Sequence, residues 1–521
     1  MTWAALGWAR KVKAELKQLR ILTKHFFARL FRNEIVDFED QMKGRLIALL
    51  SVLTIIVGWS SELLLFKFNM VPDVNISWQE KDYVFILMMI IFGIVTLLEW
   101  EVLFPDRQDF LNLTPLPIRL RTVFGAKLAS FIGFIGLFSV AMNSMSSVLF
   151  AIYLGPWRSD SPMILFRYVL AHLASAFAAC YFVFFACVFL QFVLMAVFPF
   201  TAYRRISLWV RFLLITVFIF FLLAFIAEPA ILGGSLRSLA RLKDSGAPFL
   251  FRFPPLWFVG LYEVLLGTND IVFVALAKTA GLVLCLSLLA FLLAAALSYY
   301  RHVRKTGEGQ KASPKLFWLR SSLAELFQGP VLRHPEERAV AGFFSKTIRS
   351  SPKHRVTVTN YAAVAAGFMM LLVAANRRNL GALTLQNKSL LALQLILLSF
   401  LLIGIRAAVN IPAAPEARWI FKATEGAFRT RYVSGLKKAV FFSWFAPLSV
   451  LVFLAHLLIW RNGQWAFGHA IFGLTVAGLG VEAAFCRFRK IPFACTYVPG
   501  QSRLQSRVVL YLLGFIAFLA F

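Results

Sequence analysis

The residues best suited to chemistry lie in a short charged segment that follows the second apolar run of the chain. The segment begins at Pro105, a residue type favoured in the first turn of a helix. Its charged side chains are Asp106, Arg107 and Asp109. Acidic side chains are stabilised near a helix N-terminus, so the segment predicts a short helix that is polar at its start. A short charged helix held between two apolar runs can bind a protein partner and pass the partner's movement to both runs. The predicted chemistry is therefore recognition.

A second segment of this kind follows the eighth apolar run. It also opens with a proline and an acidic residue, and its charged side chains include Glu416, Arg418 and Glu425. Both segments then pass through an amphipathic stretch and end in small and basic residues that enter the next apolar run. We interpret the two segments as copies of one partner-binding site.

Two further charges lie inside apolar runs. Lys278 and Arg406 are deeper in their runs than the other charged candidates. Because an ionised group is costly in hydrocarbon, we expect each to pair with an acidic residue or to face a cavity.

Catalytic and metal-binding motifs are absent from the sequence. It contains no G-x-x-x-x-G-K-[ST], H-E-x-x-H or G-x-S-x-G pattern, and its seven histidines are scattered. The five cysteines form no C-x-x-C pair, so neither a metal site nor a disulfide framework is expected. We predict no catalytic residue, no metal and no cofactor in this chain.

Composition identifies the solvent of the protein. Of the 521 residues, 60% are hydrophobic and only 15% are charged. Soluble domains are near 45–50% apolar and about 25% charged. This excludes a soluble enzyme, a disordered chain and a secreted disulfide scaffold.

Eleven apolar runs are long enough, or nearly so, to cross a bilayer, which takes about 20 residues. They cover residues 46–66, 83–104, 127–153, 165–199, 207–232, 270–299, 358–376, 389–410, 439–460, 464–486 and 508–521. The predicted fold is all-α, a polytopic membrane protein with about eleven transmembrane helices.

The basic residues behind the net charge of +29 predict the orientation of the chain in the membrane. With the N-terminus in the cytoplasm, 40 of the 54 Lys and Arg residues fall in cytoplasmic loops or directly beside them. This is the distribution that the positive-inside rule describes. The excess of basic residues is thus explained by membrane lipid, and no nucleic-acid partner is expected.

The apolar runs form two similar series in the same orientation, which predicts a parallel duplication. We divide the chain into a cytoplasmic interfacial helix (1–45), a first six-span half (46–299), a basic cytoplasmic linker (300–357) and a second half (358–521). The second half is one run short of six. Within the first half, the external segment 233–270 is too apolar for a solvated loop and is expected to re-enter the bilayer surface. Lys13 to Phe38 alternates leucine and phenylalanine with lysine and arginine at helical spacing, as in a helix that lies on anionic lipid.

The stretch FPDRQDFLNLTPLPIRLRTVFGAKL, from Phe104 to Leu128, resembles the coupling-helix region of type-2 ABC exporter permeases. The resemblance implies six spans per unit, an interfacial helix before the first span, a coupling helix after the second, and re-entrant helices between the fifth and sixth. It also implies that two copies of a cytosolic ABC ATPase subunit, which would bind the ATP and magnesium, dock on the two charged segments. The protein would then be a non-enzymatic transport subunit. It would be a multi-pass protein of the cell membrane, which in bacteria is the inner membrane.

Two other functions stay open on the sequence. One is an ion-coupled secondary transporter, and the other is an integral membrane enzyme that acts on a lipid-linked substrate. The first would bury several carboxylates in its spans, and the second would cluster His, Asp or Cys residues, which the sequence does not do.

Overall fold

A computed structural model gives the fold of this chain. It describes residues 3–31, 54–55, 57–62, 64–66, 77–99, 113, 115–159, 161–227, 252–307, 331–376, 388–413, 429–488 and 492–493. All regular structure within these ranges is helical, and none of it is strand. The all-α fold expected from the composition is confirmed.

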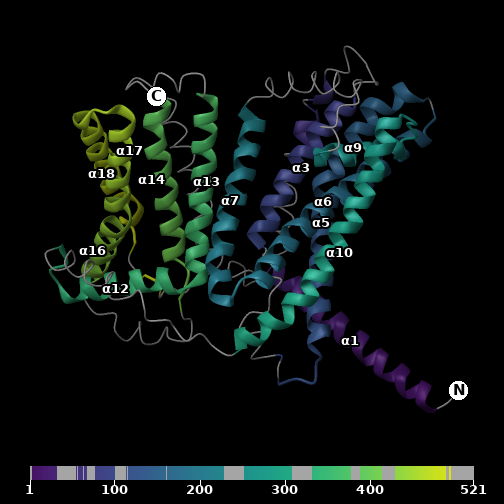
Figure 1. Cartoon of the computed structure of the whole chain (residues 1–521), viewed down its shortest axis with the longest axis horizontal. Coiled ribbons are helices and arrows are strands. Elements are labelled where there is room, and N and C mark those ends of the chain that lie inside the picture. Colours follow the sequence, from purple (N-terminus) through teal and green to yellow (C-terminus); the bar gives the residue numbers. More distant parts are fainter. Residues whose placement is uncertain are drawn as a thin grey trace. The chain divides into compact units, whose positions relative to one another are not determined.

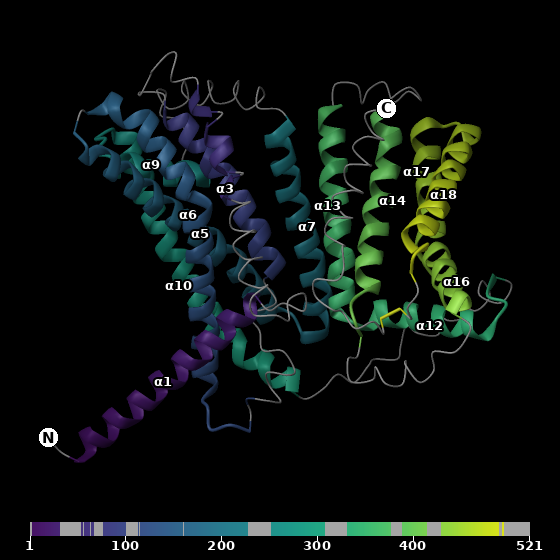
Figure 2. The same ribbon diagram turned by 180° about the vertical axis from the view of Figure 1, so that it is seen from behind.

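The helices fall into two compact units. The first unit contains α1 (Trp3–Phe31), α3 (Trp78–Glu99), α5 (Leu120–Arg158), α6 (Met163–Val197), the ends of α7 (Phe200–Ala227), α9 (Pro254–Leu265) and α10 (Ile271–Gly307). The second contains the middle of α7, α12 (Pro335–Ser350), α13 (Pro352–Ala375), α14 (Lys388–Val409), α16 (Arg429–Val440), the π-helical turn η6 (Phe441–Phe445), α17 (Ala446–Trp460) and α18 (Gly463–Phe485). Figures 1 and 2 show these helices from opposite sides.

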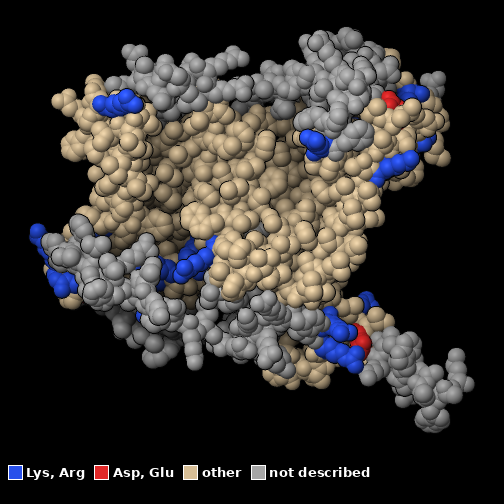
Figure 3. Space-filling model, viewed as in Figure 1, with Lys and Arg blue, Asp and Glu red and all other residues tan. Residues whose placement is uncertain are grey.

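Nine helices in the described part of the chain are long and apolar enough to cross a bilayer. They correspond to nine of the eleven predicted runs, and the protein is a multi-pass helical membrane protein. The run at 46–66 is described only in part, and the run at 508–521 lies outside the described residues. On the face drawn in Figure 3, the surface across the middle of the helices is largely free of charged side chains, and most of the Lys and Arg side chains drawn lie towards the helix ends.

The ninth run lies in a continuous helical segment that contains one π-helical turn. Helix α16 passes directly into the π-helical turn η6 and then into α17. Pro447 follows this turn, and a proline cannot donate the backbone hydrogen bond that a regular helix needs. A single π turn inside an α-helix and a proline are both places where helices bend.

Helix α6 forms the centre of the first unit. It packs against α3, α5, α9 and α10. Its aromatic side chains pack against those of its neighbours: Phe184 stacks with Phe131 of α5, and Phe192 meets Phe291 of α10 at a tilted angle. Because hydrocarbon gives no hydrophobic drive between helices, this close packing supplies the contact energy.

The second unit has its own apolar core. Phe344 of α12, Val409 of α14, Val440 of α16 and Phe485 of α18 are all buried in one cluster. The middle of α7 also joins this unit, where Thr216 donates a hydrogen bond to the carbonyl oxygen of Ala363 in α13 at 3.3 Å.

The same kinds of neighbour recur in both units. Helix α5 packs on α6, as α17 packs on α18, and α3 packs on α6, as α14 packs on α18. A helix outside the apolar spans packs on the start of the third span in each case, α1 on α5 and α12 on α16. These recurring pairs follow the order of the predicted duplication. The four-part division of the chain stays a prediction.

Gly435 marks the closest approach of α12 and α16. A β-carbon placed there would lie 2.7 Å from Glu337 Cα and 2.8 Å from its carbonyl oxygen. Backbone atoms cannot move aside cheaply, so we expect Gly435→Ala to destabilise the protein by roughly 1–3 kcal/mol, as overpacking does. Unfolding of the purified protein in detergent, followed by helicity, measures this.

Gly342 provides the matched control in α12, because a β-carbon placed there meets nothing within 4 Å. Gly342→Ala should stabilise the helix by up to about 1 kcal/mol. Equal effects of the two substitutions would contradict the close approach at Gly435.

Candidate functional site

In the first unit, α1 binds the start of α5. Leu22 and Phe26 of α1 are buried against Val123 and Ala126 of α5. The ammonium of Lys127 lies 4.9 Å from the centre of the Phe26 ring, and Arg119 forms an ion pair with Glu15 at 2.8 Å. The apolar spacing along α1 causes this packing, since it places leucine and phenylalanine on one side of the helix.

In the second unit, α12 holds the start of α16 through ion pairs. The carboxylate of Glu337 accepts hydrogen bonds from Lys438 at 2.7 Å and from the Ser434 hydroxyl at 2.7 Å. Glu336 and Arg431 form a second ion pair at 3.4 Å. In both units, an acidic residue of the peripheral helix therefore pairs with a basic residue at the start of the third span.

Electrostatics favour the ionised form of Glu337. Burial alone would raise the pKa of its carboxyl group. The hydrogen bonds from Lys438 and Ser434, with the charges of Lys438 and His334, outweigh burial and lower the pKa below its ordinary value. The carboxylate is thus charged at neutral pH and able to hold the two helices together.

The predicted partner-binding residues lie outside the described residues. This applies to Pro105, Asp106, Arg107, Asp109, Glu416, Arg418 and Glu425. What the structure describes is where each segment ends. The first segment leads through Leu113 and Ile118, which pack on the Leu22 and Phe26 cluster, into α5. The second leads directly into α16 at Arg429. Each segment therefore enters a helix that a peripheral helix clamps.

At the opposite end of the first unit lies α9, the helix found in the predicted re-entrant segment (Figures 1 and 2). Pro254 occupies its first turn. Its C-terminus ends in a Schellman motif, in which Thr268 N–H bonds the Glu263 carbonyl and Gly267 N–H bonds the Val264 carbonyl. Gly267 has φ +91°, which an L-residue with a side chain rarely adopts. With 12 residues, α9 is too short to cross a bilayer.

Helix α9 carries a buried carboxylate into the helix bundle. Glu263 Oε1 lies 2.5 Å from Lys81 Nζ of α3, and the Lys81 side chain is fully buried. Glu263 Oε2 accepts a hydrogen bond from the Thr268 hydroxyl at 3.0 Å and lies 3.5 Å from Arg158 of α5. Arg158 in turn donates to the Thr268 hydroxyl at 2.5 Å. One carboxylate thus connects α3, α5 and α9.

Aromatic rings surround this ion pair. Lys81 Nζ lies 4.6 Å from the centre of the Tyr262 ring and 5.4 Å from that of Tyr168. The His172 ring packs against Tyr262 and Phe85, at ring-centre distances of 5.3 and 5.7 Å. The rings favour the ammonium by cation–π attraction and shield it from solvent.

The charges of Lys81 and Arg158 control the ionisation of Glu263. Burial would raise the pKa of this carboxyl group. The charge and hydrogen bond of Lys81, the charge of Arg158 and the hydrogen bond from Thr268 together lower the pKa below its ordinary value of 4.5. Glu263 is therefore an anion at neutral pH despite its burial.

The two intramembrane candidates have different surroundings. Lys278 is exposed on α10, about two turns from the start of the helix at Ile271, where a lysine can extend its ammonium to the interface. Arg406 is half-buried on α14. It donates to the Ala484 carbonyl at 3.0 Å and to Asn410 Oδ1 at 2.7 Å, and it lies 4.8 Å from the Phe488 ring centre. These contacts join the ends of α14 and α18.

No sequence motif singles out Lys81, Glu263 or Arg158 as functional. The hydropathy pattern places Lys81 in an external loop just before the run at 83–104, whereas α3 begins at Trp78 and contains it. The signal that could have identified the site is Glu263 itself, the only acidic residue between Phe249 and Gly267 in a strongly apolar stretch. Such a residue requires a buried cation or its own neutralisation.

Comparison with known proteins identifies no relative. The chain matches no family model, no curated protein and no solved structure.

The buried ion pair makes a strong energetic prediction. Replacing only Lys81 with Met, or only Glu263 with Leu, leaves a charged group without its partner and should cost roughly 3–5 kcal/mol of unfolding free energy. The double variant Lys81→Met/Glu263→Leu should recover most of that loss. A double-mutant cycle of unfolding in detergent measures the coupling.

The exposed pair of Glu15 and Arg119 is the control for this cycle, because both side chains are at least 40% exposed. Its coupling should stay below about 1 kcal/mol. A buried pair that couples as weakly as this exposed one would show that Lys81 and Glu263 are not in contact.

The lowered pKa of Glu263 predicts a pH dependence. Because the folded pKa lies below the unfolded value, the ionised carboxylate stabilises the protein above pH 4.5, and this stabilisation is lost as the pH falls through the folded pKa. The difference in melting temperature between wild type and Glu263→Gln should be constant near neutral pH and shrink below about pH 4.5. A difference that grows on acidification would mean that Glu263 is protonated at neutral pH.

Proposed function

We propose that this chain is the membrane-spanning permease subunit of an ABC-type exporter in the bacterial inner membrane. Separate cytosolic ATPase subunits would dock on the loops after the second and eighth spans. The permease moves the substrate, and ATP hydrolysis belongs to the partner. The partner would bind the ATP and magnesium.

One observation carries this proposal. Both segments predicted to bind the ATPase lead into a third-span helix whose first turns are clamped by a peripheral helix, α1 on α5 and α12 on α16. A movement of either segment would therefore be transmitted to two helices that are packed together, and not to one unsupported helix end. The apolar packing of Leu22 and Phe26, and the ion pair of Glu337 and Lys438, provide that rigidity.

The short helix α9 supports the proposal from the other end of the first unit. It lies between α7 and α10, where the resemblance to type-2 exporter permeases implies external re-entrant helices. The Glu263 carboxylate of α9 pairs with basic residues of α3 and α5, so a rearrangement of those spans would also move α9 at the external side.

The test is purification of the full-length chain from its native membrane in a mild detergent. We expect an ABC ATPase to be present at about two copies per chain, with ATPase activity that vanadate inhibits. Purification without any nucleotide-binding subunit, from membranes in which the chain is fully folded, would contradict the proposal.

Asp109→Lys tests the docking segment directly. Reversing this charge should separate ATPase activity from transport, by at least tenfold in transported substrate per ATP hydrolysed, while the chain still folds and inserts. Glu425→Lys should do the same in the second segment. Asp40→Lys, in the N-terminal region, makes the same charge change outside both segments and should leave coupling unaffected. Normal coupling in both docking-segment variants would refute the assignment.

An ion-coupled secondary transporter is the second candidate, and Asp82 favours it. Both of its carboxylate oxygens are buried, with no hydrogen-bond partner in the part of the chain that the structure describes. An ionisable residue in this setting is a candidate for proton binding. Transport that continues after ATP depletion, stops with a protonophore and is lost in Asp82→Asn would select this function over the first.

A further inference from the structure

Helix α1 leaves apolar side chains uncovered beside basic ones. Leu16 and Ile21 are 59% and 58% exposed, although α1 buries Leu22 and Phe26 against α5. Lys17, Arg20 and Lys24 lie between these apolar positions and Lys13 precedes them, and all four basic side chains are exposed. Leu16 shares its side of α1 with the half-buried Leu19 and Phe27, whereas Ile21 lies on another side of the helix. Exposed apolar side chains cost free energy in water, so the side with Leu16 favours an apolar cover that tolerates cations.

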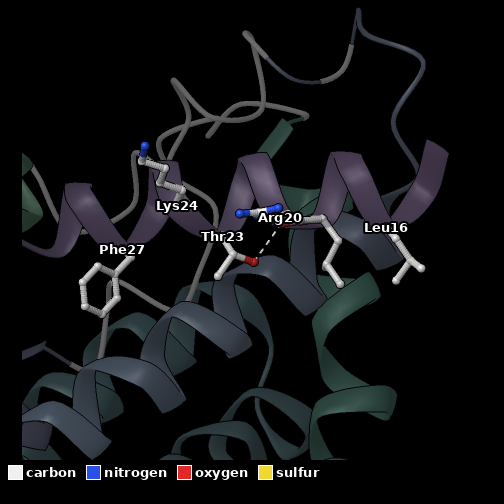
Figure 4. A pocket seen from close by; sticks show the side chains of 6 residues that line it. Leu16, Arg20, Thr23, Lys24 and Phe27 are labelled. Carbon is white, nitrogen blue, oxygen red and sulfur yellow. Dashed lines mark hydrogen bonds between the residues drawn. The ribbon is translucent and has the colours of Figure 1, made fainter. Parts of the chain in front are cut away.

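A shallow, open groove of about 490 Å³ lies on this side of the helix. Its lining residues are Leu16, Leu19, Arg20, Thr23, Lys24 and Phe27. Figure 4 shows Leu16, Thr23 and Phe27 directed to the same side of α1, with the Arg20 guanidinium between Leu16 and Thr23 along the helix. The Thr23 hydroxyl donates to the Leu19 carbonyl at 2.8 Å, so it places no unsatisfied polar group in the groove. The groove therefore combines an apolar wall with two cations.

Two glycines of α5 place the groove beside the start of a span. A β-carbon at Gly125 would lie 3.5 Å from Leu19 Cδ1, and one at Gly133 would lie 3.6 Å from Phe27 Cε2. Helix α1 thus runs along the first turns of α5, which the predicted topology places at the cytoplasmic membrane surface. Phospholipid headgroups and the upper parts of acyl chains meet at this depth.

We propose that this groove is a binding site for one anionic phospholipid. The headgroup phosphate binds Arg20 and Lys24, and an acyl chain covers Leu16, Leu19 and Phe27. The positive charges of Arg20 and Lys24 favour an anionic ligand. The apolar side chains beside them favour a ligand with an acyl chain, which is a lipid and not a free phosphate. This site is more specific than the general attraction of a basic helix to a membrane, and it does not depend on the proposed transport function.

The test uses the purified full-length chain in a neutral detergent, titrated with palmitoyl-oleoyl phosphatidylglycerol or phosphatidylcholine and observed by native mass spectrometry. We expect one phosphatidylglycerol to bind with at least tenfold preference over phosphatidylcholine. Equal binding of the two lipids would overturn the proposal.

Two double variants separate a discrete site from general charge attraction. Arg20→Ala/Lys24→Ala should weaken phosphatidylglycerol binding about thirtyfold, because each basic residue near an anionic lipid contributes about fivefold. Lys13→Ala/Lys17→Ala removes the same charge from the same helix outside the groove and should change binding less than threefold. Equal losses in the two variants would show a diffuse electrostatic surface and refute the site.

Filling the groove tests its apolar wall without any change of charge. Thr23→Phe should weaken lipid binding at least tenfold, while the melting temperature shows that the chain stays folded. Thr23→Ser keeps the hydroxyl and should bind the lipid as wild type does. Soluble glycerol phosphate should not displace the lipid, and displacement at millimolar concentration would reduce the site to an anion site and contradict the proposal.

Discussion

Hydrocarbon cannot hydrogen-bond, and this one property of the solvent governs the arrangement of the chain. Every backbone N–H and C=O at membrane depth has to be paired within the protein, which leaves continuous helices as the local solution. The consequence is clearest where a helix stops. The last carbonyl groups of α9 are bonded by the Thr268 and Gly267 N–H groups and by the Arg167 guanidinium, which donates to the Leu265 carbonyl at 2.8 Å, although Leu265 and Gly267 are themselves exposed. The left-handed conformation of Gly267 makes the chain reversal possible.

Ion pairs satisfy charged side chains as hydrogen bonds satisfy the backbone, and the free energy lost when a partner is missing depends on how deeply the pair is buried. Lys81 and Glu263 are both removed from solvent, so each requires the other, and the Tyr168 and Tyr262 rings complete the enclosure. The pairs at the other ends of the units are more exposed. Lys438 is 31% exposed and Arg119 is 62% exposed, so water and salt weaken those contacts. The buried pair therefore holds α9 firmly, whereas the peripheral helices α1 and α12 also need their apolar contacts.

Much of the fold was predictable because a bilayer leaves a strong imprint on sequence. Nine runs were located to within a few residues at many of their ends, as for 165–199 against Met163–Val197 and 464–486 against Gly463–Phe485. Errors were larger where a helix continues beyond hydrocarbon. Helix α16 starts ten residues before the run at 439, because its first turns are amphipathic and pack on α12. The π-helical turn at Phe441–Phe445 had no signal beyond Pro447. The charged segments selected first for function lie outside the described residues, so their roles stay predictions.

The sequence by itself determined the solvent, the helical class and the approximate position of each described span, since all three follow from counts and runs of apolar residues. It also located α9 as an apolar segment that does not span the membrane. Only the tertiary structure decided which charges meet. Lys81 and Glu263 are 182 residues apart, and no periodicity along a chain encodes a contact at that separation. The same holds for the position of the groove on α1, whose residues Leu19 and Phe27 lie beside Gly125 and Gly133 of α5, more than 100 residues further along the chain. Runs of apolar residues reflect the solvent around each segment. Contacts between distant residues depend on how the segments pack, and packing is a property of the folded chain as a whole.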